Sequence, residues 1–260
     1  MDYLASLFDS GAQYRTINLH RSALSSTLKP IDGYCVGQHP LVCRLLKGAF
    51  NLRPPRPKLC PSWSIKTVLD TLKEWSPASK LSLKCLSFKT CMLVALASAK
   101  RPGSLTLLST KAGFFELGAS KARFQPVELE KTEGLGHCAP PLVLEAYTED
   151  PRICPVHYIK AYVKRTRSIR SSERLFVSLV SPHGAVSAST VARWLKKTIL
   201  LSGQAGSGGS TRAASSSQAV MNGASLQAVL AAGDWARVST FRRFYFKPAE
   251  LSFQEIVLTN

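Results

Sequence analysis

The segment from Lys84 to Ala99 constrains the fold most strongly, because apolar residues cover nearly every side of the helix that it predicts. Only a sizeable domain can bury such a helix. The chain has 260 residues, of which 45% are hydrophobic, so it has enough material for that core. Its longest apolar run, Thr90–Ala99, spans about half the length that a membrane helix needs, and lysines flank it. We therefore expect a buried helix and no transmembrane segment.

A proline-rich stretch, Leu52–Pro61, predicts an extended linker, because proline lacks a backbone donor and ends helices. Before it, apolar residues recur at helical spacing and predict three helices, at Tyr3–Gly11, Tyr14–Ser26 and Pro40–Phe50. We expect two domains, a small helical one at residues 1–57 and a larger one at residues 58–260.

The larger domain is expected to be mainly α-helical with one small antiparallel sheet, an α+β fold. Its predicted strands are Gly113–Leu117, Ala122–Leu129 and Pro141–Leu144. Its other predicted helices are Ser62–Trp75, Pro155–Arg165, Ser189–Leu200, Thr211–Met221, Ser225–Ala232 and Ser239–Tyr245. The serines that begin three of these helices, Ser189, Ser225 and Ser239, suit N-caps. The glycine- and serine-rich run from Leu201 to Ser210 predicts a flexible connection.

The charge of the chain points to a polyanionic partner. The sequence has 34 Lys and Arg against 16 Asp and Glu, a formal charge of +18. Each cation that pairs with a phosphate releases counterions and strengthens association, so nucleic acid is the favoured partner.

Several other classes of site are not supported. The sequence has no phosphate-binding glycine motif, no Gly-x-Ser-x-Gly and no His-Glu-x-x-His. Its seven cysteines never form Cys-x-x-Cys, and His137 and Cys138 have no second pair at zinc-ligand spacing. We expect reduced, mostly buried thiols, no metal and no small-molecule cofactor. The N-terminus lacks the pattern of a secretory signal, so we expect an intracellular protein.

Tyr245 is a candidate nucleophile. Between Trp235 and Lys247 the chain carries four basic residues and no acidic one, so the tyrosine hydroxyl lies in a positive field suited to attack on phosphate. Four other residues are candidates for the same site, although each alone is better explained as a helix cap, a solvated charge or a core aromatic. They are Arg101, Lys131, Arg212 and Trp235.

In order along the chain, five segments resemble those of tyrosine recombinases, most closely the recombinases of DIRS-like and Ngaro-like retrotransposons. These segments are Val94–Leu105, Glu130–Thr132, Cys154–Val156, Ser210–Ala214 and Gly233–Tyr245. Residues Thr16–Ser25, Pro30–Gly33 and His39–Val42 are similar to the core-binding helices of that family. The resemblance covers nearly the whole chain. It implies a truncated, SAM-like DNA-clamp domain at residues 1–57 and a catalytic domain at residues 58–260.

The resemblance implies DNA cleavage and rejoining through a 3′-phosphotyrosine. Tyr245 would be the nucleophile, and Arg101 and Arg212 would hold the non-bridging phosphate oxygens. Lys131 would protonate the leaving 5′-oxygen, with Lys121 a weaker candidate, and Trp235 would donate a hydrogen bond from its ring. No metal or cofactor is required.

Two positions depart from the family pattern. Gly209 stands where the family's His-x-x-Arg motif has histidine, and Ser104 stands where an acidic residue commonly helps to orient Arg101. We expect Arg101 to be less firmly held as a result. Among the remaining histidines, His137, His157 and His183 could replace the missing imidazole only through folding. A catalytically impaired DNA-binding remnant of a recombinase is therefore the alternative function.

The resemblance also implies partners. The family acts on double-stranded DNA as a tetramer, so we expect DNA, a homo-tetramer, a nuclear location and no membrane. The apolar residues after Tyr245 would dock either on a neighbouring subunit or on the same chain; they are Leu251, Phe253, Ile256 and Val257. A protein-interaction module, or an RNA-binding protein that uses the basic segment Pro155–Arg170, remains a third hypothesis.

Overall fold

The computed structural model describes residues 1–55, 63–131, 133–136, 138 and 140–246. The chain divides into two units, Met1–Cys60 and Pro61–Asn260. The apolar residues after Tyr245 that were expected to dock, and His137, lie outside the described residues.

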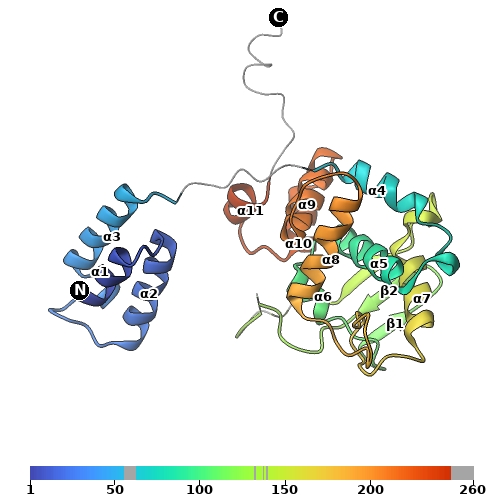
Figure 1. Ribbon diagram of the computed structural model, residues 1–260, viewed down its shortest axis with the longest axis horizontal. Helices are drawn as coiled ribbons and strands as arrows, with labels where there is room; N and C mark the ends of the chain where they lie inside the picture. Colours follow the sequence, from blue (N-terminus) through green and yellow to red (C-terminus); the bar gives the residue numbers. More distant parts are fainter. Residues whose placement is uncertain (56–62, 132, 137, 139, 247–260) are drawn as a thin grey trace, which may run out of the picture. The chain divides into compact units, whose positions relative to one another are not determined.

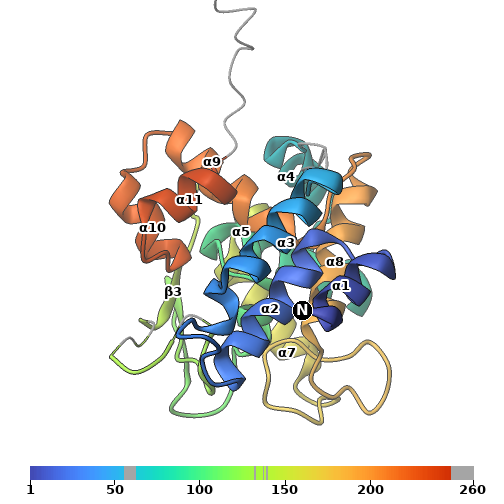
Figure 2. The same cartoon turned by 90° about the vertical axis from the view of Figure 1, so that its left-hand side faces the viewer.

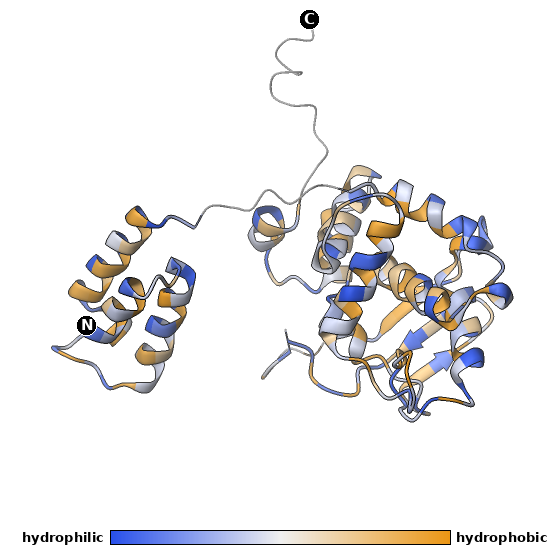
Figure 3. Cartoon of the chain, in the orientation of Figure 1, coloured by the Kyte–Doolittle hydropathy of each residue, from blue (hydrophilic) through white to orange (hydrophobic). Residues whose placement is uncertain are grey.

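The first unit consists of α1 (Asp2–Asp9), α2 (Tyr14–Thr27), the 3₁₀ turn η1 (Val36–Gln38) and α3 (Pro40–Leu52). These helices are amphipathic, as the alternation of orange and blue along them in Figure 3 shows. Their apolar faces meet in one small core made of Leu4, Ile17, Val42, Leu46 and Ala49. The guanidinium of Arg53 donates to the carbonyls of Phe8 (2.7 Å) and Ala12 (3.2 Å), which ties the end of α3 to the end of α1.

The second unit is built around α5 (Leu83–Ser98), as the apolar segment predicted (Figure 1). Eleven of its sixteen residues are buried. Around it pack α4 (Ile65–Glu74), α7 (Pro155–Thr166) and α8 (Ala188–Leu201), together with the short α6 (Pro102–Thr106) against α8. The 3₁₀ turns η2 (Ala78–Lys80) and η3 (Pro151–Ile153) lie in the connections. α6 was not predicted from the sequence. Pro102 is its first residue, a position that needs no backbone donor.

The sheet has three antiparallel strands in the order β1 (Phe115–Leu117), β2 (Lys121–Phe124) and β3 (Leu142–Glu145). Ala122 and Phe124 of β2 and Leu144 of β3 are buried on one face, against α5 and α7 (Figure 1). The mainly helical fold with a small antiparallel sheet is confirmed. The second strand is shorter than expected, because after Phe124 the chain leaves the sheet and the apolar residue Leu129 is exposed in a loop.

The C-terminal elements are η4 (Gly208–Ser210), α9 (Thr211–Met221), α10 (Leu226–Gly233) and α11 (Val238–Phe244) (Figure 2). Of these, α9 packs against α5, α10 packs against α9, and α11 packs against α10. Val229, Trp235 and Phe241 form a separate small core there, which we call the C-terminal cluster. Ser225 caps α10 as expected, but Ser187 caps α8 and Arg237 precedes α11, so the N-cap predictions for Ser189 and Ser239 were wrong.

The run from Leu201 to Ser210 is not a flexible connection. Gln204 exchanges two hydrogen bonds with the backbone of Ser64, at 2.6 and 3.1 Å, and the Trp63 ring donates to the hydroxyl of Ser210 at 2.8 Å. A Cβ on Gly208 would lie 2.2 Å from the carbonyl oxygen of Ala192. Glycine is used here because two backbones touch.

Cysteine burial also differs from the expectation. Of the six described cysteines, which are all free, only Cys91 and Cys154 are buried. Burial raises the pKa of the Cys91 thiol.

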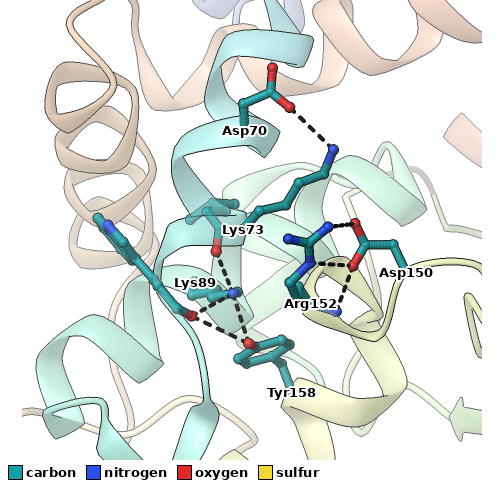
Figure 4. A network of polar contacts seen from close by, with 8 residues as sticks. Asp70, Lys73, Lys89, Asp150, Arg152 and Tyr158 are labelled. Carbon is teal, nitrogen blue, oxygen red and sulfur yellow. Dashed lines mark hydrogen bonds and ion pairs between the residues drawn. The ribbon is translucent and has the colours of Figure 1, made fainter.

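A buried lysine supports the central helix. Lys89 of α5 donates to the carbonyls of Leu72 and Trp75 (2.6 Å) at the end of α4 and to the hydroxyl of Tyr158 at 2.7 Å (Figure 4). Burial lowers the pKa of Lys89 to about 8, an effect that the negative charge of Asp150 opposes. The ammonium therefore donates to carbonyls at the C-terminal end of α4, where the helix dipole favours a positive charge.

Replacing Lys89 with methionine is expected to lower the free energy of unfolding by about 2–4 kcal/mol, because two carbonyls and a hydroxyl lose a charged donor. Chemical denaturation at pH 7 measures this change. Lys73→Met is the matched control, since Lys73 pairs with Asp70 (3.1 Å) at the surface and its loss should cost less than about 1 kcal/mol.

The loss should also depend on pH. The folded pKa of Lys89, about 8, lies below the ordinary value of 10.5, so the unfolded chain binds more protons between these values. The wild type should therefore gain stability relative to Lys89→Met as the pH rises from 8 to 10. A difference that does not change over this range contradicts the assignment.

Candidate active site

Arg212 lies at the centre of the candidate site and is 2% exposed. Its Nη1 donates to the carbonyl of Ala99 at 3.1 Å, and its Nη2 donates to the carbonyl of Gly233. These carbonyls belong to the ends of α5 and α10, which both turn out of the helix through a left-handed residue, Ala99 and Asp234. The guanidinium thus lies at two helix C-termini, where the backbone dipoles favour a positive charge.

Two aromatic rings cover the same guanidinium. The Arg212 Cζ atom is 4.0 Å from the ring centroid of Trp235 and 5.2 Å from that of Tyr245. The two rings contact each other with centroids 4.9 Å apart. Trp235 is buried, whereas Tyr245, at the C-terminal end of α11, is half-buried, and its carbonyl accepts a hydrogen bond from Ser217 at 3.1 Å. The structure therefore brings together three of the residues named from sequence.

Two donors at this site are buried without an acceptor. In the described part of the chain only three buried side-chain N or O atoms have no partner, and two of them are Nε of Arg212 and Nε1 of Trp235. Unpaired buried donors are costly, and they mark a place where an acceptor from outside the protein would bind.

Arg101 adds a second cation. It is half-buried and is the N-cap residue of α6. Burial, followed by the nearby charge of Arg101, lowers the pKa of Arg212 to about 10, while Tyr245, Asp234 and Glu130 oppose the shift. Two guanidiniums held close enough to repel each other form a site for an anion.

The carboxylate of Glu130 contacts two residues that flank Arg101 in the sequence. Its Oε1 is 2.9 Å from Nζ of Lys100, and its Oε2 accepts from the hydroxyl of Ser104 at 2.7 Å. Arg101 was expected to be less firmly held, because Ser104 replaces an acidic residue. The structure shows that an acid from another part of the chain binds that serine, while the expectation about Arg101 itself stays a prediction.

Lys131 directly follows Glu130 in a turn of the β2–β3 connection, and its side chain is exposed. Among the described residues no hydrogen bond or ion pair joins it to Tyr245, so its link to the site runs through the neighbouring Glu130. Lys121 lies on β2 with an exposed side chain, opposite Glu145 of β3. Of the two lysines, Lys131 has the closer link to Arg101, because its neighbour Glu130 contacts the chain on both sides of that arginine.

The position of the missing histidine is open. Gly209 lies in η4, and a Cβ built on it would have no heavy atom within 4 Å. The described histidines of this unit make contacts elsewhere: the His183 ring bonds the carbonyl of Ser178 at 2.8 Å, and the His157 ring packs on Tyr158. Neither therefore replaces the imidazole.

The described residues contain no group of three or more His, Cys, Asp or Glu side chains that could hold a metal ion. None of their helices is both long enough and apolar enough to cross a membrane.

Comparison with solved structures identifies the fold. XerA recombinase is 16% identical, with 98% of this chain and 86% of XerA covered and a TM-score of 0.53. The chain has the fold of a tyrosine recombinase. The Tn1549 transposon integrase in complex with transposon right end DNA gives a TM-score of 0.59 at 10% identity, with 98% and 81% covered. XerH recombinase bound to a palindromic difH substrate gives 0.58 at 13% identity, with 93% and 66% covered. No family model and no curated protein matches the sequence.

Within this recombinase fold, Glu130 and its partner Lys100 were not recognised as site residues from the sequence. Both were visible in the quoted segments, as an acid directly before Lys131 and a lysine directly before Arg101. In a chain with only 16 acidic residues, an acid beside a candidate lysine is a signal that could have indicated their pairing.

Proposed function

We propose that this chain is a DNA recombinase of a mobile element that cuts and rejoins double-stranded DNA through a tyrosine. The observation that carries the proposal is the pair of buried donors without acceptors, Arg212 Nε and Trp235 Nε1, beside the ring of Tyr245. A phosphodiester supplies the acceptor oxygens that these donors lack, and the charge of +18 favours DNA.

The proposed reaction is an in-line displacement at phosphorus. The Tyr245 oxygen forms a bond to the phosphorus as the bond to the 5′-oxygen breaks, which leaves a 3′-phosphotyrosine. Arg101, Arg212 and the Trp235 ring nitrogen stabilise the charge on the non-bridging oxygens. Lys131 gives its proton to the leaving 5′-oxygen, and the tyrosine proton passes to solvent because Gly209 offers no base.

The finer parts of the proposal follow the sequence resemblance. The chain would be related to the recombinases of DIRS-like and Ngaro-like retrotransposons and would act in the nucleus, where such an element meets its target. It would assemble as a tetramer on two duplexes, with residues 1–57 as the DNA clamp. The solved neighbours support DNA as the partner, because the Tn1549 integrase was solved with transposon right end DNA and XerH with its difH substrate.

The test uses a pool of duplexes that carry a randomised central sequence and a nick. Cleavage next to the nick releases a short strand that diffuses away, so the protein stays covalently attached. A slower band on a denaturing gel, recovered and sequenced, supports the recombinase and identifies its site. Salt-sensitive binding without a band supports the second function, a DNA-binding remnant, which the absence of an imidazole at Gly209 favours.

Arg101→Ala should weaken DNA binding through the loss of one phosphate contact. The slope of log affinity against log salt is expected to become shallower by about 1. Fluorescence anisotropy at several salt concentrations measures the slope. Arg123→Ala is the control, because Arg123 lies on β2 beside Glu116 of β1 (3.7 Å). Equal slopes for the wild type and Arg101→Ala would contradict a phosphate clamp.

A further inference from the structure

The carboxylate of Glu130 holds the chain on both sides of Arg101. One oxygen pairs with Lys100, the residue before Arg101, at 2.9 Å, and the other accepts from Ser104, three residues after it, at 2.7 Å. Each of these three side chains is at least nine-tenths buried. A carboxylate with this burial persists only when it is fully paired, so the contact is specific.

The same network reaches Arg212 through the backbone. Lys100 follows Ala99, whose carbonyl accepts from Nη1 of Arg212. The negative charge of Glu130 also opposes the lowering of the Arg212 pKa, after the larger opposing effects of Tyr245 and Asp234. Glu130 therefore belongs to the site, although its contacts are with the residues that carry the two arginines.

Lys131 directly follows Glu130 in the sequence. The connection between β2 and β3 runs from residue 125 to residue 141, and the backbone N–H of Glu130 donates to the carboxylate of Glu133 within it. The buried carboxylate is thus an anchor within a loop whose next side chain, Lys131, is exposed.

We propose that Glu130 is a positioning residue that fixes the Lys131 loop to the Arg101 segment. Its carboxylate links the loop of the proton donor to the chain on both sides of Arg101. This inference rests on the proposed function, since it assigns Lys131 to the leaving group.

A DNA substrate with sulfur in place of the leaving oxygen tests the link between Glu130 and Lys131. In a duplex with a bridging 5′-sulfur at the scissile phosphate, the thiolate leaves without a proton, so Lys131 is not needed. Glu130→Gln is expected to slow covalent complex formation at saturating DNA by about 10- to 100-fold with the oxygen substrate. With the sulfur substrate the loss should be less than about threefold, as for Lys131→Ala.

Control variants separate position from folding. Glu128→Gln changes a neighbouring acid that pairs with Arg174 at the surface, and it should leave both rates unchanged. Lys100→Met combined with Glu130→Gln removes both buried charges together, which avoids an unpaired ammonium. This double variant should melt near the wild-type temperature and still show the oxygen-specific loss.

Amide hydrogen exchange gives a readout that does not depend on activity. Exchange of residues 127–131 should accelerate in Glu130→Gln and in the double variant, while exchange in α5 stays constant. Equal slowing on both substrates, or unchanged exchange, would overturn the proposal. A wild type that forms no complex with either substrate would overturn the proposed function, and the exchange of the loop would then decide the anchor alone.

Discussion

Tyr245→Phe is expected to abolish the covalent complex with DNA, a loss of about 10³-fold or more. Phenylalanine keeps the ring that packs 4.9 Å from Trp235 and 5.2 Å from the Arg212 guanidinium, so only the attacking oxygen is removed. DNA affinity should therefore stay within about twofold of the wild-type value, because the phosphate donors are retained. The denaturing gel measures the first effect, and anisotropy measures the second.

Tyr147→Phe is the matched control for this change. Tyr147 is exposed, and its hydroxyl bonds Glu149 at 2.8 Å, away from the arginines. The Tyr147→Phe variant should form the covalent complex at the wild-type rate. A complex that survives Tyr245→Phe and disappears in another tyrosine variant would place the nucleophile elsewhere.

Gly209→His is expected to raise the rate of covalent complex formation by about 10²-fold or more, because an imidazole can take the proton from the tyrosine. The structure has room for the change. Nothing lies within 4 Å of a Cβ at this position, and Gly209 is not among the glycines with positive φ. The single-turnover rate at saturating DNA is the measurement.

Two variants show whether the imidazole itself is responsible. Gly209→Leu adds a side chain of similar size without a base and should leave the rate unchanged. Gly209→His measured as a function of pH should follow the titration of one group near pH 6.5, with the faster rate at higher pH. An unchanged rate in Gly209→His would mean that this position does not face the scissile phosphate.

Most elements of the fold could be predicted from local patterns. α9 has the predicted bounds, and α5 differs by one residue at each end, because spacing and burial in these helices depend on their own residues. The elements that differ depend on distant contacts. The run before Arg212 is glycine-rich because Gly208 touches the backbone of Ala192 on α8, which local composition cannot show.

The candidate site could be predicted in part for a similar reason. Arg212, Trp235 and Tyr245 lie within 34 residues of one another, and the structure brings them into contact. Their catalytic roles, and that of Lys131, stay predictions. Glu130 could not be predicted as a partner of Ser104, because 26 residues and two strands separate them and only the fold brings them together.

Arg212 connects two parts of the second unit, the central helix α5 and the C-terminal cluster. Its two amino groups bond the end of the central helix α5 and the end of α10, which belongs to the C-terminal cluster. Among the described residues, three apolar side chains of that cluster are buried, so we expect it to open as a separate cooperative unit while the central core stays folded. Because Tyr245 packs on the cluster, such an opening would carry the nucleophile away from the phosphate. Opening of the cluster would then prevent cleavage. A bound phosphodiester would accept a hydrogen bond from Nε of Arg212 and would shift the equilibrium toward the closed cluster.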